Sequence, residues 1–472
     1  MPQTIIEKIW NEHQIADLGD GTCLIYIDRI FLHERTGSVA LKSLKASNRR
    51  LRNPEQVFCT MDHIVDTTHG RNDNTRMPGG TAFIQTTREA ALAADIKLFD
   101  LGDQRQGIVH VIASEQGIAL PGVTLVCPDS HTGTLGGIGA LAWGIGSTEA
   151  EHALATKTLV VKKPRTMRVT FTGQLPTGVT AKDMILTLIA KHTASGGVGY
   201  AIEFAGDAVY RLPIEARLTL CNMTVEFGAW SGLVAPDRAT FEYVRGRPYA
   251  PPEHQWEQAT DYWLSLHSDH DAVFDKEITI DCAEIVPQVT WGTSPMHATG
   301  INRLVPNPAD EPDENIRTSM QRALQYMALT PGTPLEGIPI DAAFIGSCTN
   351  SRLSDLRAAA EILKGRKVAT GVKAICVPGS GLVKQAAEAE GIDKIFTDAG
   401  FEWRESGCSM CFFAGGESFG LEERVISSTN RNFENRQGPR TRTHLASPTT
   451  VAASAIKGHL TDVRNINQDQ VN

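Results

Sequence analysis

The chain has 472 residues, of which 41% are hydrophobic and 21% are charged, a composition typical of globular proteins with sizeable cores. Its formal net charge of −9 argues against a general nucleic-acid-binding protein, because phosphate binding needs clustered positive charge. No apolar run approaches the roughly 18 residues that span a bilayer, and the N-terminal residues lack the features of a secretion signal, so we expect a cytoplasmic protein without a membrane partner.

Short apolar segments with β-branched residues alternate with helical patterns along the chain. The predicted strands are residues 22–27, 108–113, 124–127, 167–171, 343–345 and 374–377. The predicted helices are residues 86–94, 352–363 and 383–390, and the second has Ser351 as its predicted N-cap and Gly365 as its stop signal. This alternation predicts an α/β protein with largely parallel sheets.

Two breaks in this alternation predict three domains. The basic, proline-containing segment 162–166 ends the first α/β block, and the pattern relaxes into loops near residue 285. We therefore predict domains at residues 1–165, 166–285 and 286–472.

A glycine-rich stretch, residues 135–146 (LGGIGALAWGIG), does not fit the dinucleotide-binding pattern G-x-G-x-x-G, because Ala142 stands at the last glycine position after Gly137-Ile138-Gly139. The sequence has no P-loop either. We expect instead that these glycines allow close packing of a helix on a sheet.

Cys408 and Cys411 form the one C-x-x-C motif of the chain. Zinc would need a second such pair or a histidine pair at comparable spacing, and neither is present. A redox dithiol usually lies between a strand and a helix, and no clear strand precedes this motif. The motif by itself leaves unligated thiols and an iron–sulfur site open. Most of the nine cysteines stand in apolar surroundings, which is typical of core residues in a reducing compartment.

Cys348 adds a third thiol in a favourable place. It lies in GSCTNSR (residues 346–352), directly after the predicted strand 343–345, at the sheet edge where α/β proteins bind ligands. Three thiolates are one fewer than a fully protein-ligated [4Fe–4S] cluster uses, so one iron would stay open. An open iron is a Lewis acid for a substrate oxygen, which favours hydration chemistry over electron transfer.

Several further motifs occur along the chain in an order that matches a known family. They are M-D-H (61–63), G-I-V-H (107–110), D-S-H-T (129–132), C-N-M (221–223) followed by Glu226, G-S-C-T-N-S (346–351), G-C-S-M-C (407–411) and S-T-N-R-N-F (428–433). Each motif is weak alone, but together they span nearly the whole chain. The sequence resembles the aconitase superfamily, and within it the large subunits of 3-isopropylmalate dehydratases most closely.

This resemblance implies three α/β/α domains of the aconitase type around a central cluster site, without the swivelling fourth domain of one-chain members. It implies one [4Fe–4S] cluster per subunit, bound by Cys348, Cys408 and Cys411, with one iron not ligated by protein. It also implies a separate small subunit that supplies the swivelling domain and the base, since this chain has no G-S-S-R-E loop.

The implied reaction removes a proton next to a carboxylate and expels a β-hydroxyl group, so positive groups must absorb the charge that builds up. Arg431 and Arg436 are the natural clamps, because guanidinium groups match carboxylates bidentately. By resemblance, Asp62 supports His63, Asp129 supports His110, and Glu226 supports His131, with His63 as the general acid. Ser130 and Asn222 are implied to bind substrate, and Asn350 and Asn430 to lie beside the cluster. The other histidines, including His69, His152, His297 and His444, are predicted to be structural.

The implied function is the conversion of 2-isopropylmalate to 3-isopropylmalate in leucine biosynthesis, by dehydration and rehydration. Four departures from the usual large-subunit pattern flank the site: Pro128 for Gly, Leu135 for His, the segment 412–416, and Asn435 for Gly. They keep open a related dehydratase that acts on dimethylmalate, citramalate or homocitrate. A non-catalytic scaffold that senses iron or binds RNA is a further alternative, which the acidic charge disfavours.

Overall fold

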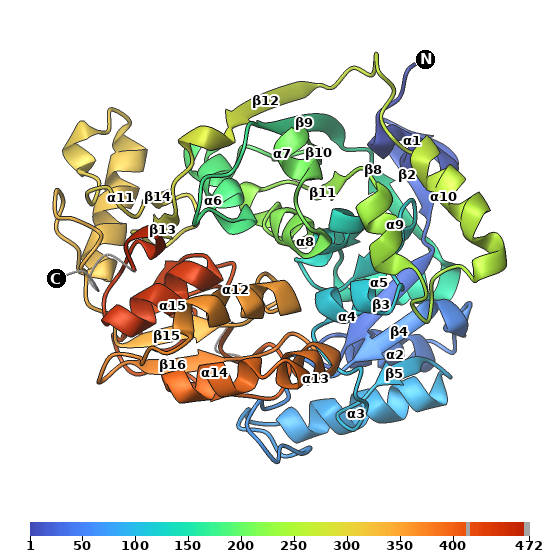
Figure 1. The fold of residues 1–472 in the computed structure, drawn as a ribbon. Coiled ribbons are helices and arrows are strands. Elements are labelled where there is room, and N and C mark those ends of the chain that lie inside the picture. The colour runs from blue at the N-terminus through green and yellow to red at the C-terminus, as the bar shows by residue number, and fades with distance from the viewer. Residues whose placement is uncertain (412–415, 467–472) are drawn as a thin grey trace.

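Strands and helices alternate through the described part of the chain, residues 1–411 and 416–466 of a computed structural model (Figure 1). The strands form five sheets, and the three largest are parallel throughout. This confirms the predicted α/β class. Among the described residues, no helix is both long enough and apolar enough to cross a membrane.

The first sheet has the order β5-β4-β3-β6-β7. Its strands are β3 (Arg29–His33), β4 (Val57–Thr60), β5 (Lys97–Phe99), β6 (Thr124–Cys127) and β7 (Leu141–Gly144), with helices α2 (Gly37–Ala46), α3 (Gly80–Ala93), α4 (Val109–Glu115) and α5 (Ser147–Thr156). The chain forms the central strand β3 first, then adds β4 and β5 toward one edge of the sheet, and then adds β6 and β7 toward the other edge. The loops after β3, β4 and β6 therefore leave from the same edge, beside the switch in strand order.

An antiparallel three-stranded sheet lies next to this unit. It consists of β1 (Gln14–Gly19), β2 (Thr22–Tyr26) and β8 (Thr158–Lys162), preceded by α1 (Ile5–His13). The buried face of α1 joins the same hydrophobic core as the first sheet, since Ile5, Ile9 and Trp10 are fully buried there.

The second sheet has the order β11-β10-β9-β12. Its strands are β9 (Arg165–Thr172), β10 (Tyr200–Ala205), β11 (Ser231–Val234) and β12 (Lys276–Asp281), with helices α6 (Ala181–His192), α7 (Asp207–Tyr210), α8 (Ile214–Asn222), α9 (Arg238–Val244) and α10 (Trp256–Ser265). A hairpin of β13 (Gln288–Thr290) and β14 (Ala298–Gly300) and the helix α11 (Glu314–Met327) lead to the last part of the chain.

The third sheet, β17-β16-β15-β18-β19, repeats the centre-then-edge order of the first, a similarity that the sequence does not reveal. Its elements are β15 (Ala342–Ile345), α12 (Leu353–Leu363), β16 (Lys373–Cys376), α13 (Gly381–Ala389), α14 (Ile392–Ala399), β17 (Phe401–Trp403), β18 (Arg424–Ser427), β19 (Arg442–Leu445) and α15 (Pro448–Lys457).

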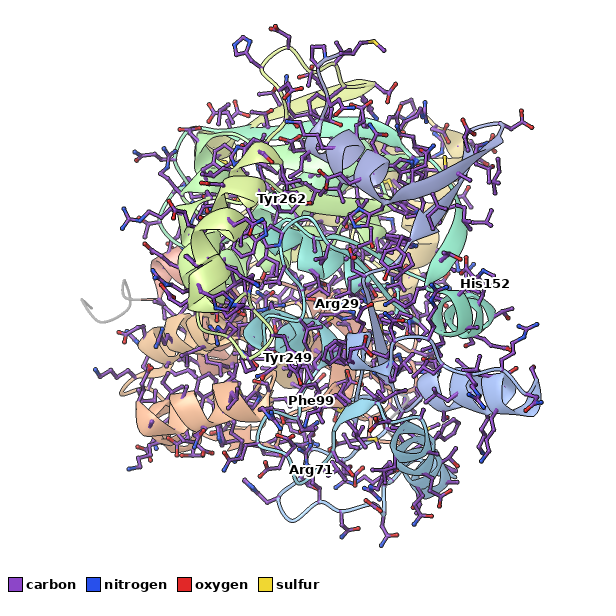
Figure 2. The ribbon with its side chains drawn as sticks, turned by 90° about the vertical axis from the view of Figure 1, so that its right-hand side faces the viewer. Arg29, Arg71, Phe99, His152, Tyr249 and Tyr262 are labelled. Carbon is purple, nitrogen blue, oxygen red and sulfur yellow. The ribbon has the colours of Figure 1, made fainter. Side chains whose placement is uncertain are left out.

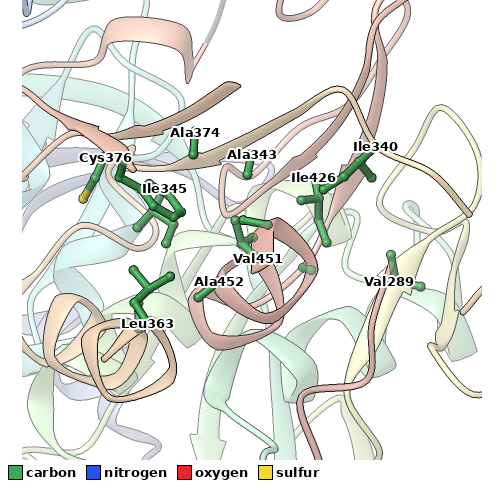
Figure 3. Packing of buried hydrophobic residues seen from close by; sticks show 14 of the residues in the cluster. Val289, Ile340, Ala343, Ile345, Leu363, Ala374, Cys376, Ile426, Val451 and Ala452 are labelled. Carbon is green, nitrogen blue, oxygen red and sulfur yellow. The ribbon is translucent and has the colours of Figure 1, made fainter. Parts of the chain in front are cut away.

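The two faces of the third sheet are covered differently. Ala343 and Ile345 pack against Leu363 and Val451 of the helices (Figure 3). Ala342 and Phe344, on the other face, pack against Met410 and Phe419. The segment that carries Cys408 and Cys411 is thus held against the sheet that carries Cys348.

Most predicted elements are confirmed within a few residues, but three details of the prediction are wrong. No strand is predicted before the C-x-x-C motif, whereas β17 ends at Trp403, shortly before Cys408. Of residues 108–113, predicted as a strand, Val109–Ala113 belong to helix α4 and Ile108 is its N-cap. Val109–Ser114 are buried on all sides, and a fully buried apolar run has the same pattern in either structure. Helix α12 has Arg352 rather than Ser351 at its N-cap, and the Asp355 carboxylate accepts a hydrogen bond from the Arg352 backbone N–H. The domain boundaries stay predictions; they coincide with the start of β9 and with the loop after β12.

Glycines 136 and 137 lie in the 3-10 helix Thr132–Ile138, which packs against both β11 and α8. A Cβ atom on Gly136 would lie 1.8 Å from the carbonyl oxygen of Gly232, and one on Gly137 would lie 2.6 Å from the backbone nitrogen of Leu218. The glycines therefore allow close packing, as predicted, although the partners include a helix as well as a strand.

We expect Gly136→Ala to lower the free energy of unfolding by about 3 kcal/mol, because the added methyl group collides with backbone atoms that cannot rotate away. The measurement is the midpoint of urea unfolding. Gly102→Ala is the matched control, since a Cβ atom there has no neighbour within 4 Å. Equal midpoints for the two variants would contradict the packing explanation.

Candidate active site

A cavity of about 280 Å³ is lined by loops that follow strands of the first and third sheets. Eleven of the predicted site residues line it: His63, His110, Asp129, Ser130, His131, Cys348, Cys408, Cys411, Asn430, Arg431 and Arg436. Their loops follow β4, β6, β15, β17 and β18, apart from His110, which is in α4. The carboxyl ends of two parallel sheets thus contribute to one site, as expected for α/β proteins.

Three of the predicted residues do not line the cavity but contact residues that do. Asp62 bonds to His63, Asn222 bonds to Cys348, and Glu226 bonds to His131. Asn350 is different, because its amide donates to Thr219 Oγ1 and to Asp355 Oδ1. Asn350 therefore supports the start of α12 rather than the cavity.

The three cysteines fit the ligand set of an iron–sulfur cluster. Cys348, Cys408 and Cys411 are free thiols that are 6–7% exposed and line the same cavity. The other six cysteines are also buried and free, but none of them lines it. Cys376, for example, lies in the core of the third sheet (Figure 3).

Hydrogen-bond donors surround these sulfur atoms. The amide groups of Asn222 and Asn430 approach Cys348 Sγ at 3.2 and 3.4 Å, and Arg436 Nη2 approaches Cys411 Sγ at 3.6 Å. Ser347 Oγ lies 3.3 Å from Cys411 Sγ, on a residue with a positive φ of 85°. Such donors stabilise thiolate and sulfide charge, so the pocket suits a bound inorganic cluster.

Burial and the neighbouring Cys411 raise the pKa of Cys348 to about 12. Iron would reverse this shift, because a bound cation favours the thiolate. Three buried polar atoms of residues that line the cavity, His33 Nδ1, His110 Nε2 and Asn430 Oδ1, have no hydrogen-bond partner among the described residues. Unpartnered polar atoms at a cavity indicate that a ligand completes it.

His63 lies between two carboxylates. Its Nδ1 is 2.6 Å from Asp62 Oδ1, and its Nε2 is 3.1 Å from Asp129 Oδ2. Burial alone would lower the pKa of His63, but the charges of Asp62 and Cys408 and the two carboxylate bonds raise it well above its usual value. The two carboxylates thus favour the protonated form of His63.

Asp129 contacts more histidines than predicted. It was assigned to His110, but its oxygens lie 3.8 Å from His110 Nε2 and only 3.1 Å from His63 Nε2. Burial lowers the pKa of His110 to about 4, so its ring is neutral at pH 7. The carboxylate of Asp129 thus acts on both histidines: it raises the pKa of His110 against the effect of burial, and it lies closest to His63.

His131, Glu226 and Arg431 form a linear network. Glu226 Oε1 accepts hydrogen bonds from His131 Nε2 at 3.0 Å and from Arg431 Nε at 2.7 Å. Burial by itself would lower the pKa of His131, but the interactions with Glu226 and Asp129 raise it above its usual value. Glu226 thereby fixes one edge of the Arg431 guanidinium group at the cavity.

His33, the last residue of β3, and the residues that follow it are part of the site, although they are not among the predicted site residues. His33 was counted among the structural histidines, yet it lines the cavity and stacks on His63 with ring centroids 4.1 Å apart. The two oxygens of Glu34 accept hydrogen bonds from the backbone nitrogens of Asp62 and Ile64, at 3.0 and 2.5 Å. Arg35 and Thr36 also line the cavity. The available signal was the run of polar residues directly after the strand 29–33.

Unlike His33, the four histidines that the sequence analysis names as structural lie outside the cavity. His69 is exposed and pairs with Glu405, and His152 is exposed on α5 at the edge of the molecule (Figure 2). His297 stacks on Trp291, and His444 bonds to the Thr290 carbonyl oxygen.

The structure places three of the four departures from the usual pattern and explains one of them, Asn435. Pro128 lines the cavity, and its carbonyl oxygen lies 3.2 Å from His33 Nε2. Leu135 is fully buried in the core. Asn435 has a φ of 66°, a conformation that Asn tolerates better than most residues and that Gly adopts freely. Of the fourth, segment 412–416, residues 412–415 lie outside the described residues.

Comparison with known proteins gives consistent results. A model of the Aconitase family (aconitate hydratase) matches residues 7–458. The 3-isopropylmalate dehydratase large subunit 1 of Bradyrhizobium diazoefficiens is 54% identical over 464 residues, which are 98% of this chain and 97% of the relative. The holo-form of Thermococcus kodakaraensis aconitase X is similar over 98% of this chain and 93% of its own, at 12% identity and a TM-score of 0.47, a likeness too low to bear on function. The sequence match over nearly the whole chain shows that this protein belongs to the aconitase family.

Proposed function

We propose that this chain is the large subunit of a cytoplasmic 3-isopropylmalate dehydratase, which interconverts 2- and 3-isopropylmalate in leucine biosynthesis. The observation that carries the proposal is the joint placement of three buried thiols, a doubly paired histidine and two arginines at one cavity. The similarity to a large subunit along 98% of the chain favours isopropylmalate over other malates.

Cys348, Cys408 and Cys411 would hold one [4Fe–4S] cluster with one iron not ligated by protein. When bound, that iron supplies Lewis-acid chemistry for the hydroxyl and carboxylate oxygens of the substrate. The sulfur-directed amides of Asn222 and Asn430 would hold the thiolate of Cys348 in its ligating geometry.

His63 would protonate the leaving hydroxyl group. Asp62 holds Nδ1, so the proton at Nε2 is the one that can reach a substrate in the cavity. Asp129 lies beside Nε2 and keeps the imidazole ring of His63 protonated. When substrate is bound, its leaving hydroxyl group would accept the Nε2 proton in place of Asp129. His33 covers one face of this ring and limits its rotation.

Arg431 and Arg436 would bind the two carboxylates of the substrate. Glu226 holds Arg431 through Nε, and the guanidinium group of Arg436 lies 5.1 Å from the ring of Phe433. Both side chains are therefore oriented before substrate arrives, which reduces the entropy lost on binding.

We expect Arg431→Lys to raise the KM for substrate by about tenfold to a hundredfold, because an ammonium group cannot bind Glu226 and a carboxylate through one planar fork. The measurement is steady-state kinetics of the assembled enzyme. Arg322→Lys is the control, since Arg322 is 77% exposed and pairs with Glu434 at the surface. An unchanged KM in Arg431→Lys would contradict the clamp role.

We further propose that a separate small subunit closes the cavity and supplies the base that removes the substrate proton. The match to a protein that is itself a large subunit supports this partner. The chain with its cluster would then be inactive until the small subunit is added.

The test of the proposed function uses anaerobically reconstituted chain together with a small subunit from the same genome that carries a G-S-S-R-type loop. We expect conversion of 2-isopropylmalate to 3-isopropylmalate, measured by chromatography, and no conversion by either subunit alone. Dimethylmalate, citramalate and homocitrate are tested in parallel. A higher kcat/KM for one of these malates would replace the proposed substrate, and a chain that binds no iron would refute the proposal.

A further inference from the structure

Lys182 is fully buried, an unusual position for a lysine that has no carboxylate as its hydrogen-bond partner. It is the second residue of α6, in the unit of the second sheet. Its Nζ donates hydrogen bonds to the backbone carbonyl oxygens of Ser428 and Thr429, at 3.0 and 2.5 Å. These carbonyls belong to the loop after β18 of the third sheet, so one side chain connects two α/β units.

The two residues that follow in this loop both belong to the site. Asn430 donates to Cys348 Sγ at 3.4 Å, and Arg431 bonds to Glu226 at 2.7 Å and lines the cavity. The backbone of residues 428–429 therefore determines where a sulfur-directed donor and a substrate clamp lie. The other hydrogen bonds of these two residues stay within the third sheet unit: the Ser428 N–H donates to the Phe344 carbonyl oxygen, its hydroxyl group donates to the carbonyl oxygens of Gly346 and Asn350, and the Thr429 N–H donates to Ser427 Oγ. Lys182 is therefore the contact that ties these carbonyl oxygens to the second sheet unit.

We propose that Lys182 is a positioning residue for the cluster and the substrate: it holds the Ser428 and Thr429 carbonyls and thereby places Asn430 against Cys348 and Arg431 at the cavity. The substrate part of this role rests on the proposed function. The cluster part depends only on the contacts of Asn430 with Cys348.

The charge of Lys182 contributes as well. Burial lowers its pKa to about 8, and Glu226, Asp183 and Asp355 counteract part of this shift, so the side chain is mostly charged at pH 7. A buried positive charge and an N–H donor at a cluster sulfur both favour the reduced, more negative cluster, and both raise its reduction potential.

Lys157 provides a matched control within the same chain. It too is fully buried, it donates from Nζ to a backbone carbonyl oxygen, that of Asp28, at 2.9 Å, and burial lowers its pKa to about 8. It lies between α5 and β8, and it neither lines the cavity nor bonds to a residue that does. Lys157→Met therefore removes a comparable buried ammonium group without changing the loop at 428–431.

The experiment compares Lys182→Met and Lys157→Met as assembled, cluster-loaded enzymes. We expect both variants to lower the thermal midpoint, but only Lys182→Met to raise KM by about tenfold and to shift the cluster midpoint potential to a more negative value. If Lys182→Met keeps the wild-type KM and potential, or if Lys157→Met shifts them equally, the positioning role is refuted. Should Lys182→Met not fold, Lys182→Gln and Lys157→Gln are compared with the same criteria.

The potential also separates this inference from the proposed function. If the wild-type enzyme does not convert isopropylmalate, the proposed function fails. The potentials of the Lys182 and Lys157 variants still decide whether Lys182 positions Asn430 at the cluster, because that measurement needs no substrate.

Discussion

Cys348→Ala is expected to bind no stable [4Fe–4S] cluster. The activity of the assembled variant enzyme should be lower than that of the wild type by more than about a thousandfold. The reason is that Cys408 and Cys411 alone leave two irons without protein ligands, while Asn222 and Asn430 lose the sulfur atom to which they donate. Iron content, visible absorbance and turnover after anaerobic reconstitution are the measurements.

Cys376→Ala is the matched control for this variant. Cys376 is also buried in the unit of the third sheet, at the end of β16, but it packs among apolar side chains and does not line the cavity. We expect this control to bind iron as the wild type does, with a modest loss of stability. If Cys348→Ala retained full iron content, or if Cys376→Ala lost it, the assignment of the ligands would be wrong.

His63→Gln is expected to lower kcat by roughly 10²- to 10⁴-fold while iron content stays at the wild-type level. Glutamine can still donate a hydrogen bond, but it cannot carry the proton that Asp62 and Asp129 keep on the imidazole ring. The measurements are iron content and steady-state kinetics, and the loss should appear in kcat because proton transfer belongs to the chemical step.

His69→Gln is the control for His63→Gln, since His69 lies six residues later, is 68% exposed in its side chain and pairs with Glu405 at the surface. Its kcat should equal that of the wild type. A kcat of His63→Gln within a few-fold of the wild-type value would transfer the acid role to another group, and the raised pKa of His131 makes it the next residue to test.

Much of the site could be predicted because it consists of short segments that directly follow strands. Cys348 follows β15, and Asp129, Ser130 and His131 follow β6 in the way that ligand-binding loops of α/β proteins do. The strand boundaries were readable from local apolar patterns, and the order of the motifs supplied the rest.

The partnerships between site residues were less predictable. The predicted pair of Asp129 and His110 is present at 3.8 Å, but no sequence pattern shows that the same carboxylate lies closer to His63, at 3.1 Å. His33 and Glu34 were missed because their roles depend on the loop after β4, about thirty residues away, and no local pattern encodes which side chains will stack or bond across that separation.

By itself, the sequence determined the α/β class, several of the strands and helices, and the family to which this chain belongs. These features depend on residue types and periodicities within short segments, so they can be recognised without knowledge of the tertiary structure. Only the tertiary structure decided that residues 109–113 form a helix, that His33 stacks on His63, and that Lys182 holds a loop 246 residues further on. The physical reason is that burial on all sides removes the pattern that separates helix from strand, and that contacts between distant segments depend on how the sheets pack.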